Sequence, residues 1–188
     1  MSETATEVLT LSPEQEAVRL WEGAEAELSA ASKDFVALCE ALDLGVRAAQ
    51  ILAILRVRPA RDSLPATVAM LLDQPPPEVD PWRDVVHLPK TLQFAEAIDL
   101  LSADELECIT PHLHHGWEDR MWSCRRARKA ARGAAGITLG PSERTQLMVL
   151  AAYRNRIFEM SPPVTVDPAA ILEAFPALRD LVEQLSRD

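Results

Sequence analysis

The chain has 188 residues, of which 29 are Asp or Glu and 19 are Lys or Arg, so its formal net charge is -10. Hydrophobic residues make up 48% of the chain but aromatic residues only 5%. This composition excludes collagenous, disulfide-stapled and wholly disordered chains. The net charge argues against general, sequence-independent binding to nucleic acid, because that affinity comes from Lys and Arg displacing counterions.

The sequence favours a cytoplasmic protein. Its first residues are acidic and polar, where a secretory signal would need a basic and then an apolar region. The longest apolar run, 48–55, ends at Arg56 and is far shorter than the ~20 residues that cross a bilayer. Cys39, Cys108 and Cys124 are widely spaced, odd in number and placed in helix-like segments, so we expect three reduced thiols.

The prolines, glycines and apolar spacing of the chain predict an all-α fold. There are 14 prolines but only 6 glycines, and alternating β-branched residues are almost absent. Apolar residues at helical spacing, with matches to the capping box at Ser12 and Ser102, define the expected helices. These helices cover 12–31, 32–44, 46–58, 64–72, 89–101, 102–109, 117–132, 141–158 and 176–186. We therefore expect an irregular bundle of about eight or nine short helices with proline-rich connectors.

The domain organisation follows from the same breaks. Residues 1–11 are predicted to be a disordered acidic tail, and 12–188 a single helical domain. The segment 74–82 contains four prolines and is the best candidate for a boundary within that domain. A second extended connector is expected over 161–166.

The charge is distributed unevenly along the chain. Residues 117–160 contain nine bases and four acids, a local net charge of +5 in a chain of -10. On a helical projection of 117–132, Cys124, Ala127 and Ala131 share one face, and basic residues cluster on the adjacent face. This basic helix is the main candidate for a functional surface.

Two interpretations of the basic helix are open. In the first, its arginines only neutralise acidic helices of the same chain. In the second, exposed Trp and Arg side chains bind a partner, since these residue types are enriched where protein interfaces gain most of their affinity. The candidate partner-binding residues are Trp117, Arg120, Trp122, Arg125, Arg126, Lys129 and Arg132.

One cluster carries residue types that ligate metals. On an unbroken helix, Cys108, His112 and His115 would share a face, and Glu105 or Glu118 would complete a tetrahedral site. Pro111 disturbs that register, and the paired short spacings typical of zinc sites are absent. The more ordinary interpretation is that the histidines lie at a helix junction and Cys108 is a small core residue.

The sequence contains no nucleophile elbow, phosphate-binding loop or dinucleotide fingerprint, so we expect neither an enzyme nor a cofactor. The preferred hypothesis is a cytoplasmic protein–protein interaction module, an adaptor, assembly factor or regulator, whose basic helix binds an acidic surface of another protein. Self-association is a further option. The first alternative is a regulator that binds nucleic acid or another anionic ligand through the same helix, and the second is a metal-binding protein.

Overall fold

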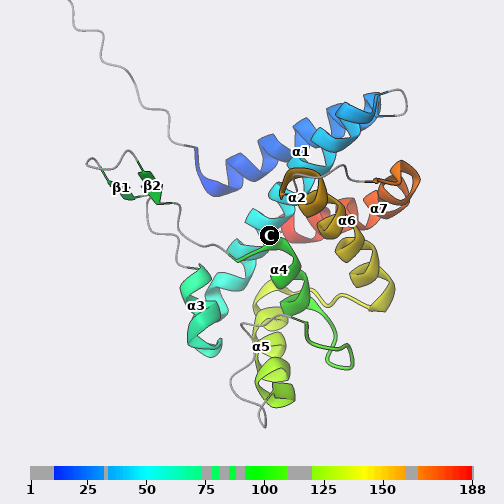
Figure 1. Ribbon diagram of the computed structural model, residues 1–188. Coiled ribbons are helices and arrows are strands. Elements are labelled where there is room, and N and C mark those ends of the chain that lie inside the picture. Colours follow the sequence, from blue (N-terminus) through cyan, green and yellow to red (C-terminus); the bar gives the residue numbers. More distant parts are fainter. Residues whose placement is uncertain are drawn as a thin grey trace, which may run out of the picture.

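The computed structural model describes residues 11–31, 34–72, 78–80, 85–87, 92–109, 120–159 and 165–187. It confirms the all-α class (Figure 1). The described residues form α1 (Pro13–Ala30), α2 (Phe35–Val57), η1 (Arg58–Ser63), α3 (Ala66–Leu72), α4 (Phe94–Leu101), α5 (Arg120–Ala135), α6 (Pro141–Glu159) and α7 (Pro168–Ser186). Seven of these elements are α-helices and η1 is a 3₁₀ helix, so the expected number of eight or nine was slightly too high for this part of the chain. Two strands, β1 (Glu78–Asp80) and β2 (Val85–His87), form an antiparallel pair.

The start of α1 is as predicted. The Ser12 hydroxyl accepts a hydrogen bond from the Gln15 backbone N–H at 3.2 Å, and the Ser12 N–H donates to Gln15 Oε1 at 2.9 Å. This capping box satisfies two amide groups that an uncapped helix would leave without a partner. Within α1, Ala17 is buried in the core, whereas Val18 is 53% exposed.

Helix α2 replaces two predicted helices, since it continues through Gly45 where a break was expected. A β-carbon at Gly45 would lie 3.0 Å from Leu178 Cδ2 and 3.4 Å from Phe175 Cζ. The absence of a side chain therefore lets α7 pack closely against α2. This contact offsets the cost of about 1 kcal/mol that a glycine brings to a helix interior.

Helix α7 begins eight residues before the predicted final helix, 176–186. The Asp167 carboxylate accepts a hydrogen bond from the Ala169 N–H at 3.0 Å, and the helix then runs through Pro176 without ending. Eight buried side chains on α7 offset the hydrogen bond that a proline cannot donate. They are Ile171, Ala174, Phe175, Ala177, Leu178, Leu181, Val182 and Leu185.

Residues 102–109 were predicted to be a helix, and the structure shows that this was wrong. The segment is irregular, and Ser102 forms a parallel bridge with Leu139. The Ala103 N–H donates to the Leu139 carbonyl at 3.0 Å, and the Leu139 N–H donates to the Leu101 carbonyl at 2.8 Å. Pairing with this distant segment competes successfully with the local capping signal.

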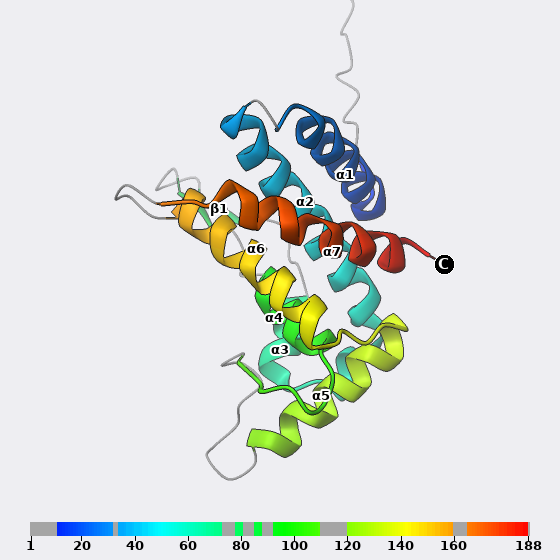
Figure 2. The same cartoon turned by 90° about the vertical axis from the view of Figure 1, so that its right-hand side faces the viewer.

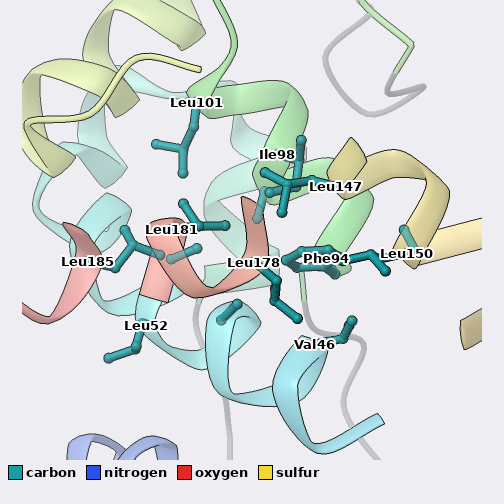
Figure 3. Packing of buried hydrophobic residues seen from close by; sticks show 14 of the residues in the cluster. Val46, Leu52, Phe94, Ile98, Leu101, Leu147, Leu150, Leu178, Leu181 and Leu185 are labelled. Atoms are coloured by element: carbon teal, nitrogen blue, oxygen red, sulfur yellow. The ribbon is translucent and has the colours of Figure 1, made fainter. Parts of the chain in front are cut away.

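Helix α2 lies at the centre of the molecule and contacts α1, α4, α5, α6 and α7 (Figure 2). The core between these helices consists largely of aliphatic side chains, among which Phe94 lies close to Leu178 and Leu150 (Figure 3). Near the end of α6, Phe158 is 49% exposed. In both overall views α1 and α5 lie at opposite ends of the molecule.

The predicted tail, most of the proline-rich segment 74–82 and most of the connector 161–166 lie outside the described residues. Among the helices that the structure describes, none has the length and apolar character needed to span a bilayer.

Candidate functional site

Helix α5 presents one buried face and one exposed face, as its sequence predicted. Cys124, Ala127 and Ala131 are buried. Three basic residues, Arg125, Arg126 and Lys129, are exposed, and we call them the basic α5 face. The helix contains six basic and no acidic residues, so its own sequence supplies no carboxylate to neutralise that face.

The sequence interpretation missed Arg128, which is the largest fully buried side chain that the structure describes. Its guanidinium forms a salt bridge with Asp99 of α4, with 2.5 Å between Nη2 and Oδ1. The two side chains are 1% and 0% exposed. Two buried charges are tolerated only when they are paired and their remaining polar atoms are hydrogen-bonded, and this pair meets both conditions.

Arg128 also holds the irregular segment 102–109 in place. Its Nε donates to the Asp99 carbonyl at 2.8 Å. Its Nη1 donates to the Ala103 carbonyl at 3.0 Å and the Leu106 carbonyl at 2.5 Å. Its Nη2 reaches the Glu107 carbonyl at 3.1 Å. These carbonyls are occupied by an arginine from a distant helix, which explains why the local helix signal of the segment failed.

Asp99 has further donors on its other side. The Ile109 N–H donates to Oδ2 at 3.1 Å, and Arg144 Nη2 lies 3.3 Å from Oδ1. Arg144 also donates to the Glu107 carbonyl at 2.8 Å. One carboxylate thus connects α4, α5, α6 and the segment 102–109 in a buried polar cluster.

Arg132 was predicted to bind a partner, but it is largely engaged within the fold. It donates to the Ser102 carbonyl at 2.6 Å and forms a salt bridge with Asp104 at 2.9 Å. The hydrogen bond from Arg132 is the main reason that the pKa of the Asp104 carboxyl lies below its usual value. Three of the predicted partner-binding residues have no described side chain. Trp117 lies outside the described residues, as do the side chains of Arg120 and Trp122.

The cysteines differ from expectation. Cys108 and Cys124 form a disulfide, so the prediction of three reduced thiols was wrong for this pair, while Cys39 has a free thiol. Helix α5 and the segment 102–109, both fixed by Arg128, bring the two sulfur atoms together. Sequence spacing alone gave no indication of this contact.

The described residues provide no set of ligands that supports the metal-site hypothesis. The Cys108 sulfur is bonded to Cys124 rather than free as a thiolate, and His112 and His115 lie outside the described residues. Within the described part of the chain, no three His, Cys, Asp or Glu side chains are grouped as metal ligands.

An open groove of about 450 Å³ lies where the end of α5 meets α7, and Gly136, Asp180, Glu183 and Arg187 contribute to its lining. Two carboxylates and one guanidinium leave this groove with an acidic lining.

No family model, curated protein or solved structure matches this chain.

Proposed function

We propose that the protein is an interaction module, an adaptor, assembly factor or regulator, that binds an acidic surface of another protein through the basic α5 face. The supporting observation is that Arg125, Arg126 and Lys129 are exposed, whereas Arg128 and Arg132 of the same helix are engaged within the fold. A cytoplasmic location belongs to the same proposal.

Internal ion pairs account for part of the positive charge on α5. Arg128 pairs with Asp99, Arg132 pairs with Asp104, and the Asp104 carboxylate also interacts electrostatically with Arg125. The most acidic helix is α1, with five acids and one base, but it lies at the opposite end of the molecule from α5 (Figures 1 and 2). At ordinary ionic strength, charges separated by more than about 8–10 Å are largely screened from one another.

A protein partner is favoured over nucleic acid because the basic α5 face is small. Three phosphate contacts on duplex DNA would give a log–log salt dependence of only about -2.7, from about 0.9 per phosphate. The net charge of -10 would oppose even this weak binding. A compact group of arginines instead suits carboxylates on a protein, since the guanidinium can bind them in a bidentate manner.

The experiment compares immobilised wild-type protein with a variant in which Arg125, Arg126 and Lys129 are all replaced by Glu. Proteins retained from a cell extract are quantified by mass spectrometry, and each candidate is then purified and its binding measured directly. We expect at least one directly binding protein to be retained by the wild type and lost by the variant. Circular dichroism must show unchanged helix content, because all three substitutions are on the surface.

A second charge reversal provides the matched control. Arg19, Arg156 and Arg187 are exposed bases on α1, on α6 and just beyond α7, so replacing them by Glu changes the net charge equally without touching α5. Retention by this control, together with loss in the α5 variant, supports the proposal. An identical set of bound proteins in all three samples overturns it. Steeply salt-dependent binding to duplex or single-stranded DNA would favour the nucleic-acid alternative instead.

A further inference from the structure

The Cys108–Cys124 disulfide joins the irregular segment 102–109 to the second turn of α5. The two cysteines differ in exposure, since Cys124 is 2% exposed whereas Cys108 is only partly buried. Cys108 is therefore the more accessible residue for a reagent in solution. Structural disulfides are concentrated in small secreted domains with sparse cores, whereas this chain has a large aliphatic core.

The surroundings of Cys108 also suit a thiol. Its Sγ lies 3.4 Å from Asp99 Oδ2, the carboxylate oxygen that accepts the Ile109 N–H. A disulfide sulfur has no proton, so in the oxidised protein this contact is not a hydrogen bond. In the reduced protein the Cys108 S–H can donate to Asp99 at the distance already present. The buried cluster thus has an acceptor in place for the reduced form.

We propose that Cys108 and Cys124 form a reversible redox site that exchanges with small dithiols. A thiolate of the dithiol attacks Cys108 Sγ, the Sγ–Sγ bond breaks, and Cys124 leaves as a thiolate that takes up a proton. The second thiol of the reagent then attacks the mixed disulfide and releases Cys108 as a thiol. Two electrons and two protons pass to the protein, and the reagent becomes a disulfide.

Reduction removes one tether of the first turns of α5 but leaves the other contacts of the segment 102–109. Arg128 and Arg144 still donate to its carbonyls, so the fold persists. The turns that loosen carry Arg125 and Arg126. The redox state would then alter partner binding, and this last step alone rests on the proposed function.

Counting thiols tests the redox chemistry. Alkylation after denaturation is expected to label only Cys39 in the oxidised protein, and all three cysteines after the folded protein is treated with dithiothreitol. Circular dichroism should retain the helical signal, and oxidised glutathione should restore the single label. Three labelled cysteines after oxidation, resistance of the folded protein to dithiothreitol, or unfolding on reduction would each overturn the proposal.

Hydrogen exchange tests the structural consequence. The variant Cys108→Ser keeps a hydroxyl that can donate to Asp99 and imitates the reduced state. We expect amides in 120–127 to exchange at least about tenfold faster in this variant and in the reduced wild type than in the oxidised wild type. Cys39→Ser is the matched control and should exchange like the oxidised wild type. Equal exchange in all samples would show that the disulfide does not restrain α5, whether or not the basic α5 face binds a partner.

Discussion

Replacing Arg128 by Met tests whether the buried polar cluster holds the fold together. The substitution keeps an unbranched side chain but removes every hydrogen bond that Arg128 donates to Asp99 and to the segment 102–109. Breaking a buried ion pair costs about 3–5 kcal/mol, because the remaining charge stays in a medium of low polarity. Arg144 and the Ile109 N–H still contact Asp99, which lowers that cost. The Ala103 carbonyl loses a buried donor, which adds about 1 kcal/mol. We therefore expect a loss of about 4 kcal/mol.

Urea unfolding measures this loss through the midpoint and the slope of the transition. Arg125→Met is the matched control, because it makes the same substitution on the exposed face of the same helix. It should change the free energy of unfolding by less than about 0.5 kcal/mol. A chain of this size should also lose about 8–16 °C in melting temperature for Arg128→Met, at about 2–4 °C per kcal/mol. A loss below about 1 kcal/mol with an unchanged slope would refute the reasoning.

Two further predictions concern glycines and pH. Gly45→Ala should lower the free energy of unfolding by about 1 kcal/mol, because the new methyl group lies 3.0 Å from Leu178 Cδ2. Gly133→Ala should raise it by about 0.5–1 kcal/mol, because a β-carbon there has no neighbour within 4 Å and alanine is the better helix former. The same sign for both in urea unfolding would contradict the packing explanation. The lowered pKa of Asp104 means that its charged form stabilises the fold above about pH 4, and that this contribution disappears as the pH falls through the lowered pKa. Because Asp104 is 45% exposed, Asp104→Asn should cost about 0.5 kcal/mol or less at pH 7, and this cost should shrink as the pH falls through the lowered pKa; a pH-independent cost would show that its charge is not responsible.

The elements that the sequence predicted correctly depend on local signals. The Ser12 capping box starts α1, Pro141 opens α6, and small residues on one side of α5 face the core. The errors occurred where a distant partner decides the conformation. Gly45 and Pro176 disfavour a helix interior by local rules. Both helices nevertheless continue at these residues, because α2 packs against α7.

The buried ion pair left a signal that could have been recognised. Asp99 is an acid within the otherwise apolar end of α4, and Arg128 lies one turn after Cys124 on the stripe of small residues that faces the core. A charged residue on an apolar stripe requires a buried counter-charge, so each of these residues implied a partner. Their pairing, and hence the contact between Cys108 and Cys124, depends on how α4 packs against α5, and periodicity does not encode that arrangement.

The role of the pair follows from what Arg128 does besides neutralising Asp99. Buried ion pairs can often be replaced by apolar side chains without loss of stability. Here the double variant Asp99→Leu, Arg128→Met should still lose at least about 2 kcal/mol, because the Ala103 and Leu106 carbonyls lose the donor that Arg128 supplies. Full recovery of wild-type stability would mean that Arg128 stabilises the fold only by neutralising Asp99. A persistent loss, with faster hydrogen exchange over 102–109, would mean that the guanidinium mainly fixes this segment and so keeps Cys108 within reach of Cys124.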